Sequence, residues 1–268
     1  MKSGLYGLVV GVGLTVMALE GAGQFAPHEM FRRAAYTNSV GRVIPYQLHA
    51  PQFPEKGKRY PVILFLHGSG ECGTNNISQL RFGIPALMKQ VVMYPEQVMV
   101  AAPQCRISNA WVRRLAFSPA YRAEKRPTLA LRDALEICDD LIRNRQGDPD
   151  RLYITGLSLG GFGTWDAIQR DPGRFAAAAP LCAGGDVTAV RGLKNLPIWV
   201  VHGDADRNVP VVASRMMVNA LKEAGSRRVR YQEIKGATHN IWDRTYGDPA
   251  FLRWMLSQSR RKPWWKFW

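Results

Sequence analysis

Ser158 lies between two glycines in the stretch TGLSLGGFG, residues 155–163. The residues before it predict a short buried strand over 151–155, and those after it predict a helix over 162–170. Gly156 and Gly160 complete the G-x-S-x-G spacing of a nucleophile elbow, a strained turn whose close neighbours must be small. The spacing also occurs by chance, so the alternative is a glycine-rich turn with an incidental serine.

A serine hydroxyl becomes a useful nucleophile only when a base accepts its proton and a carboxylate orients that base. In sheets with this elbow the chain order is serine, acid, histidine. Of the five histidines, only His239 follows the elbow in a loop after the penultimate predicted element, which makes it the candidate base. For His67 and His202, in His-Gly steps at strand ends, we expect packing and turn roles. The loop HGDADRNVP offers Asp204 and Asp206 as the acid, and the pattern alone does not choose between them; Asp204 could instead cap the loop.

The elements that must position these groups alternate between strands and helices. The pattern predicts strands over 30–36, 42–49, 61–66, 97–103, 151–155, 175–182, 197–201 and 229–234. It predicts helices over 128–145, 162–170, 211–224 and 251–257, with a turn at 148–150. The alternation implies a mostly parallel sheet with helices on both faces, whose chemistry collects at the carboxyl ends of the strands. The candidate serine, acid and base each follow a predicted strand.

Composition limits the class of protein. The chain has 268 residues, enough for one large domain, and its 46% hydrophobic and 21% charged residues are typical of a globular protein. The formal net charge of +15 suggests attraction to anionic surfaces. Because no nucleic-acid-binding motif accompanies the charge, we do not expect nucleic acid as the partner.

Both ends of the chain differ from the central domain, which we expect over 24–258. Lys2 and the apolar run Leu5–Leu19 predict a secretory signal peptide over 1–23, with an uncleaved anchor as the alternative. Export would place the protein in the periplasm or outside the cell, where an uncleaved anchor would associate it with a membrane. Residues 259–268 form a basic, aromatic tail for which we expect a membrane-surface contact, docking to a polymer substrate, or folding back over an apolar groove.

The four cysteines match no zinc or redox spacing. Cys72 and Cys105 each lie just past the end of a predicted strand, so they are the best candidates for a disulfide in an exported protein. Cys138 lies in a helical pattern that predicts a buried thiol. No cluster has the spacing of a metal site, and we expect neither metal nor cofactor. The sequence does not indicate an oligomeric state.

Several segments together resemble the α/β-hydrolase superfamily. They are YPVILFLHGSGECGTNN, VAAPQC, LYITGLSLGGFGTWDAIQRDPGRFAAAAPLCAGGD, PIWVVHGDADRNVPV and GATHNIW, between residues 60 and 256. The resemblance is to secreted serine esterases of the dienelactone-hydrolase-like, feruloyl-esterase-like and polyhydroxybutyrate-depolymerase-like group, which includes proteins described as predicted peptidases. It implies an α/β-hydrolase fold, Asp206 as the acid, His239 as the base, and an oxyanion hole formed by the backbone N–H groups of Ser69 and Leu159.

The same resemblance implies a carboxylic ester hydrolase that acts through an acyl-enzyme on a small-molecule or polymer-borne ester. A serine peptidase on this fold is the first alternative, although 268 residues leave no room for the propeller or lid domain of many such peptidases. A non-catalytic binding protein on the same scaffold is the second. Two further residues are candidates for substrate contact. Glu71 could touch substrate or be an exposed loop carboxylate, and Trp111 could stack on an acyl group or belong to the core.

Overall fold

A computed structural model describes residues 27–38, 40–113 and 121–260 of the chain. The predicted signal peptide over 1–23 and the tail residues 261–268 lie outside the described residues. Among the described residues, no helix combines the length and the apolar character needed to cross a membrane.

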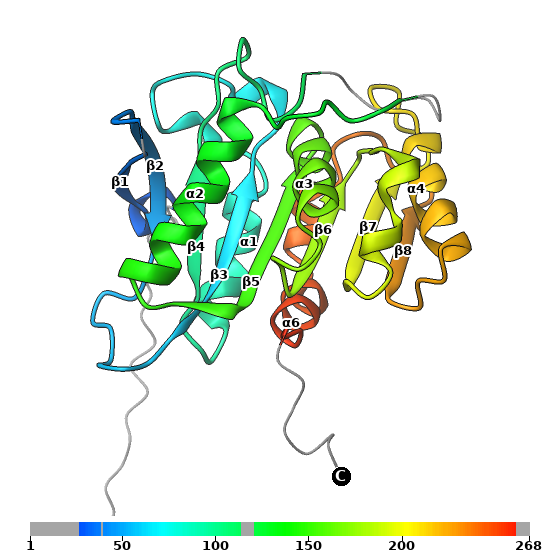
Figure 1. Ribbon diagram of the computed structural model, residues 1–268. Coiled ribbons are helices and arrows are strands. Elements are labelled where there is room, and N and C mark those ends of the chain that lie inside the picture. Colours follow the sequence, from blue (N-terminus) through cyan, green and yellow to red (C-terminus); the bar gives the residue numbers. More distant parts are fainter. Residues whose placement is uncertain (1–26, 39, 114–120, 261–268) are drawn as a thin grey trace, which may run out of the picture.

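The described part of the chain is built on one eight-stranded sheet (Figure 1). The strands are β1 (Arg32–Thr37), β2 (Val43–His49), β3 (Tyr60–Leu66), β4 (Met99–Pro103), β5 (Gly147–Leu157), β6 (Ala177–Leu181), β7 (Ile198–Gly203) and β8 (Val229–Ile234). Their order across the sheet is β1-β2-β4-β3-β5-β6-β7-β8. The first two strands pair antiparallel at one edge, and all pairs from β4 to β8 are parallel. The predicted mostly parallel sheet is therefore confirmed.

Helices cover both faces of the sheet (Figure 1). The longer helices are α1 (Ile84–Met93), α2 (Leu129–Asn144), α3 (Leu159–Arg170), α4 (Val212–Glu223) and α6 (Pro249–Leu256), and α5 (Trp242–Tyr246) is a single short turn. Apolar side chains of α2, α3 and α4 share one hydrophobic cluster with the sheet, and those of α1, α5 and α6 share the other.

The central strand β3 shows why its sequence is apolar throughout. Every residue of Tyr60–Leu66 is buried. Leu64 and Leu66 belong to the cluster under α2 and α3, whereas Ile63 and Phe65 belong to the cluster under α1 and α6. Because successive side chains of a strand point to opposite faces, a strand covered on both sides must be continuously apolar.

The connections create a switch point beside β3. From β3 the chain passes through α1 to β4 on one side, and then returns through α2 to β5 on the other side. Loops diverge at the carboxyl ends of strands at such a point, and ligands of open α/β sheets bind there. Ser158 directly follows β5, and His67 directly follows β3.

Two local predictions need correction, and one helix was missed. The turn predicted at 148–150 lies inside β5: Gly147 pairs with Tyr60 and Leu152 with Val62, so the extra residues of β5 between these pairs are an irregularity in the strand. Helix α3 begins at Leu159 rather than at residue 162, directly after the elbow serine. Helix α1 was not predicted; its first turn contains a proline, and it follows Gly83, whose φ is 73°.

Candidate active site

The turn at Ser158 has the strained backbone expected of an elbow. Its φ of 52° and ψ of −117° are unusual for a residue with a side chain. The turn is held from both sides: the Ser158 N–H donates to the carbonyl of Leu181 at 3.0 Å, and the Ser158 carbonyl accepts from Phe162 N–H at 3.1 Å. Strand β6 and helix α3 therefore fix the serine between them.

The glycines of the elbow are required by close backbone approaches. A Cβ atom on Gly156 would lie 2.4 Å from the Gly160 carbonyl oxygen, and one on Gly160 would lie 1.9 Å from the Leu66 carbonyl oxygen. Neither distance is compatible with van der Waals contact. The small neighbours predicted from the sequence thus allow α3 to start against the end of β3.

The structure brings Ser158, His239 and Asp206 together. The Nε2 atom of His239 is 2.9 Å from Ser158 Oγ, and its Nδ1 atom is 2.6 Å from Asp206 Oδ2. Since a carboxylate only accepts, Nδ1 carries the proton and Nε2 is left free to accept from the serine hydroxyl. This is the hydrogen-bond order of a serine hydrolase triad.

Asp206 is held rigidly as a charged group. One oxygen accepts from the N–H groups of Asn208 and Val209, each at 2.9 Å, and the other faces His239. Burial acts to raise the pKa of Asp206, but the Val209 N–H and His239 outweigh it, so the pKa lies below its ordinary value. The other candidate, Asp204, accepts from the N–H of Gly236 at 2.6 Å, in the loop after β8 rather than in its own loop.

His202 does more than pack the end of β7. Its Nε2 lies 2.9 Å from the Val209 carbonyl oxygen and 3.2 Å from Asp206 Oδ2. Both neighbours are acceptors, so Nε2 carries a proton, which it donates to the Val209 carbonyl with Asp206 Oδ2 close by. Burial lowers the pKa of His202, which keeps the ring neutral. The packing role predicted for His202 is therefore incomplete, because the ring also positions Asp206.

The oxyanion-hole candidates lie at two neighbouring helix starts. Leu159 is the first residue of α3, and Ser69 is the first residue of a short 3-10 turn, Ser69–Glu71, that follows β3. The N–H groups of a first helical turn have no acceptor within their own helix. We call residues 67–72 the oxyanion loop. The contact between Gly160 and Leu66 sets the elbow directly against the start of this loop.

His67 and Trp111 brace the oxyanion loop from behind. His67 Nε2 accepts from Cys105 N–H at 3.1 Å, so its Nδ1 donates to the Gly68 carbonyl at 2.6 Å. Burial lowers the pKa of His67 to about 4. Trp111 donates its indole N–H to the His67 carbonyl at 3.0 Å, and its ring meets the His67 ring edge-on. Trp111 is only 1% exposed, so stacking on an acyl group is wrong and the core alternative is correct.

Glu71 is also placed differently from both expectations. Its side chain is buried within the oxyanion loop, not exposed on it, and one carboxyl oxygen lies against Gly68. Burial raises the pKa of Glu71, while a hydrogen bond with the Gly68 backbone and the nearby Arg81 act in the opposite direction. This enclosure leaves the carboxyl no open face for substrate, so Glu71 supports the loop instead.

Two residues beside His239 were not found from the sequence. The ring of Trp242 meets the His239 ring edge-on, with centroids 5.5 Å apart. Cys182, whose φ is 49°, directs its Sγ at the His239 carbonyl at 3.4 Å. Trp242 ends the GATHNIW segment, three residues after the base, and this spacing is the signal that could have identified it. Nothing in the sequence around Cys182 indicates its backbone strain.

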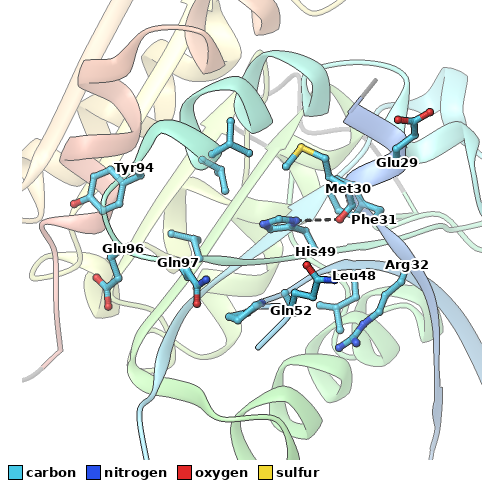
Figure 2. Close-up of a pocket in the computed structure, with 15 residues that line it drawn as sticks. Glu29, Met30, Phe31, Arg32, Leu48, His49, Gln52, Tyr94, Glu96 and Gln97 are labelled. Carbon is cyan, nitrogen blue, oxygen red and sulfur yellow. Dashed lines mark hydrogen bonds between the residues drawn. The ribbon is translucent and has the colours of Figure 1, made fainter. Parts of the chain in front are cut away.

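A cavity of about 590 Å³ lies away from this site (Figure 2). Met30, His49 and Tyr94 are among the residues that line it, and His49 Nδ1 contacts the Met30 carbonyl oxygen at 3.0 Å. No triad residue lines this cavity. His49 pairs with Val100 at the start of β4, so the cavity lies toward the amino ends of the parallel strands, opposite Ser158.

Two groups of described residues have ligand atoms close enough for a metal ion. They are His67 with Cys72 and Cys105, and Cys182 with His202 and Asp206. In each group both nitrogens of the histidine already face hydrogen-bond partners. A metal would have to displace those partners, so neither group fits a metal ion in this arrangement.

The doubly covered parallel sheet, with this triad geometry at its carboxyl edge, defines an α/β hydrolase. Sequence comparison agrees with that class, because the pattern of the phospholipase/carboxylesterase family matches residues 53–250. The chain belongs to this family.

Individual proteins are similar to this chain over part of their own length. A thermostable esterase of known structure superposes with a TM-score of 0.75 at 34% identity, over 87% of this chain and 64% of that protein. An acylaminoacyl peptidase of Pyrococcus horikoshii superposes with a TM-score of 0.62 at 16% identity, over 88% of this chain and 43% of that protein, which is a likeness of fold alone. An uncharacterized secreted protein of Arthroderma benhamiae is 24% identical over 219 residues, or 69% of this chain and 22% of its own length. The chain thus spans less than two thirds of each of these proteins.

Proposed function

We propose that this hydrolase is a serine esterase that cleaves carboxylic esters through Ser158, His239 and Asp206. The observation that carries the proposal is the continuous pair of hydrogen-bond contacts, 2.9 Å from Ser158 Oγ to His239 Nε2 and 2.6 Å from His239 Nδ1 to Asp206 Oδ2. The similarity to a thermostable esterase, at 34% identity, supports an ester as the substrate.

Acylation begins when Ser158 Oγ attacks the ester carbonyl carbon and His239 Nε2 accepts the hydroxyl proton. The carbonyl oxygen becomes an oxyanion, which the N–H groups of Ser69 and Leu159 stabilise. One such donor contributes about 3 kcal/mol to transition-state stabilisation in measured cases. Asp206 holds the His239 tautomer and stabilises the imidazolium that forms.

His239 next acts as an acid toward the leaving alcohol, and then as a base toward water. The imidazolium of His239 gives its proton to the leaving alcohol oxygen as the bond from carbon to that oxygen breaks, leaving an acyl group on Ser158. Water then loses a proton to His239 Nε2 and attacks the acyl carbon. Collapse of the second oxyanion releases the carboxylic acid and returns the proton to Ser158.

We also propose that the enzyme acts after export. The charged start and apolar run of residues 1–23 support this, as does the similarity to a secreted protein of Arthroderma benhamiae. The substrate would then be a small ester, or an ester borne on a polymer, outside the cytoplasm.

The proposal is tested by hydrolysis of p-nitrophenyl acetate. We expect Ser158→Ala and His239→Gln each to lower kcat by about 10⁶-fold, the loss seen when either member of a comparable triad is removed. Ser257→Ala, at an exposed position, and His49→Gln, in the distant cavity, are the matched controls and should keep wild-type turnover. Substantial turnover by Ser158→Ala would overturn the proposal.

Ester and amide substrates pass through similar intermediates, so the triad does not separate an esterase from a peptidase. A panel of short acyl, feruloyl and polyester substrates should be compared with a panel of blocked peptides. We expect kcat/KM for the best ester to exceed that for the best peptide by more than about 10²-fold, a discrimination of at least 2.7 kcal/mol in the transition state. The reverse preference would identify a peptidase.

A further inference from the structure

Cys72 and Cys105 meet directly behind the oxyanion loop. Their sulfur atoms are 3.7 Å apart, and both thiols are free, so the disulfide expected from the sequence is not formed in this structure. Cys72 ends the oxyanion loop, whereas Cys105 follows β4. We propose that these two thiols are a redox modification site, and that their disulfide fixes the oxyanion loop to the end of β4. This inference does not depend on the proposed ester substrate.

The backbones that carry the two thiols are already joined. Gly73 N–H donates to the Cys105 carbonyl at 2.9 Å, and the Gln104 side chain donates to the Glu71 carbonyl at 2.9 Å. A disulfide needs the sulfurs at about 2.05 Å, so they must approach by about 1.7 Å. With the flanking backbone in contact, we expect side-chain rotation to supply most of that approach.

The two thiols differ in a way that suits thiol–disulfide exchange. Cys72 is partly exposed, whereas Cys105 is buried. The hydrogen bond between the two thiols lowers the pKa of Cys72 and raises the pKa of Cys105. Because Cys72 is the thiol that a reagent in solution can reach, it is the attacking thiolate and Cys105 is the resolving thiol.

The oxidant is a small-molecule disulfide. The Cys72 thiolate attacks one sulfur of that disulfide, and the bond between its two sulfurs breaks to release the first small thiolate. Cys105 then loses its proton and attacks Cys72 Sγ in the mixed disulfide, releasing the second small thiolate. Two protein thiols are oxidised, one disulfide is reduced, and the two protons end on the two released thiols.

The neighbourhood favours this bond over a bound metal. One ring nitrogen of His67 lies within 4.8 Å of both sulfurs. However, the ring already donates to the Gly68 carbonyl and accepts from the Cys105 N–H. The two thiols are the members of the group that can react without breaking these contacts.

The consequence of the cross-link follows from what it ties together. The oxyanion loop carries Ser69, and it is braced by Cys105 N–H through His67. A disulfide across 33 residues removes disorder from the unfolded chain. We expect oxidation to raise the melting temperature by about 5–15 °C and to slow the thermal loss of esterase activity.

The test compares the oxidised and reduced forms of the full chain. The protein is incubated with oxidised glutathione, its remaining thiols are alkylated, and it is digested with trypsin without reduction. Cys72 and Cys105 lie on the separate tryptic peptides 60–81 and 90–106, and Cys138 and Cys182 lie on two others. Mass spectrometry should find 60–81 joined to 90–106, and calorimetry should find the higher melting temperature.

Two variants make the outcome decisive. In Cys72→Ser, oxidation should no longer raise the melting temperature, whereas Cys138→Ser, at a buried thiol in α2, should keep the rise. Alkylation of both Cys72 and Cys105 after oxidation would overturn the proposal, and so would a cross-link that leaves the melting temperature unchanged. Both readouts are independent of turnover, so failure of the proposed esterase function would be distinguished from failure of this inference.

Discussion

Replacement of Gly160 by alanine tests whether the direct backbone contact between the elbow and the start of the oxyanion loop fixes the position of both. A Cβ at this position would lie 1.9 Å from the Leu66 carbonyl oxygen and 2.8 Å from that of His67. Both atoms are backbone at the end of β3, so no side-chain rotation relieves the overlap. The start of α3 and the end of β3 must separate by about 1 Å.

This separation should affect both stability and rate. Overpacking lowers the free energy of unfolding by about 1–3 kcal/mol. Because the obstacle at Gly160 is backbone, we expect the cost of Gly160→Ala to lie at the upper end of this range. That cost corresponds to a melting temperature lower by about 6–12 °C. Because Ser158 and Leu159 lie on one side of the gap and Ser69 on the other, a 1 Å shift should lower kcat for p-nitrophenyl acetate by about 10²-fold.

The matched control is Gly173→Ala in the loop after α3. The nearest heavy atom to a Cβ there is Asp171 Oδ1, at 3.9 Å, so neither melting temperature nor kcat should change appreciably. Wild-type stability and turnover in Gly160→Ala would refute the close approach. A lower melting temperature with unchanged kcat would show that the contact between Gly160 and Leu66 does not position the oxyanion hole.

Two further predictions concern the acid and the buried histidine behind the loop. Asp206→Asn should lower kcat by about 10⁴-fold while keeping the wild-type circular dichroism spectrum, whereas Asp204→Asn should lower it by less than about tenfold, and the opposite ranking would reassign the acid. In the folded protein, burial holds the pKa of His67 at about 4, whereas the pKa of an unfolded histidine is about 6.5. The contribution of the neutral His67 ring to the free energy of unfolding is therefore complete above pH 6.5. It declines as the pH falls from 6.5 to 4, because only the unfolded chain takes up the proton. We expect the free energy of unfolding to fall by about 3 kcal/mol over this range, and to fall by less in His67→Gln; equal slopes in denaturant titrations of both proteins would contradict this role.

The parts of the site that follow from local rules could be predicted from the sequence. The elbow at Ser158 appears directly in the sequence as glycines at fixed spacing, although the approach to Leu66 that requires Gly160 is made by a distant strand. The position of His239 follows from the order of the strands, because each parallel strand delivers its next loop to the same edge of the sheet. Choosing Asp206 over Asp204 needed the resemblance to known hydrolases, since both acids lie in one loop and differ only in which way they face.

The parts that depend on how distant segments pack could not be predicted. A loop glutamate is ordinarily exposed, and nothing in the sequence indicates that the oxyanion loop folds around Glu71. Trp111 lies in a segment without periodicity, and it is buried because it packs in the cluster that contains Leu66 of β3 and against Gly163 of α3. His202 faces Asp206 only because the loop after β7 curls back over its own strand.

The central claim is that Ser158 carries the acyl group, and trapping that intermediate tests it most directly. The enzyme would be mixed with excess p-nitrophenyl acetate, quenched with acid during the first turnover, and digested with trypsin, which leaves Ser158 in the peptide 152–170. We expect a burst of p-nitrophenol and one acetyl group on Ser158, both lost in Ser158→Ala. Turnover without a burst, or an acetyl group located on another residue, would contradict the claim.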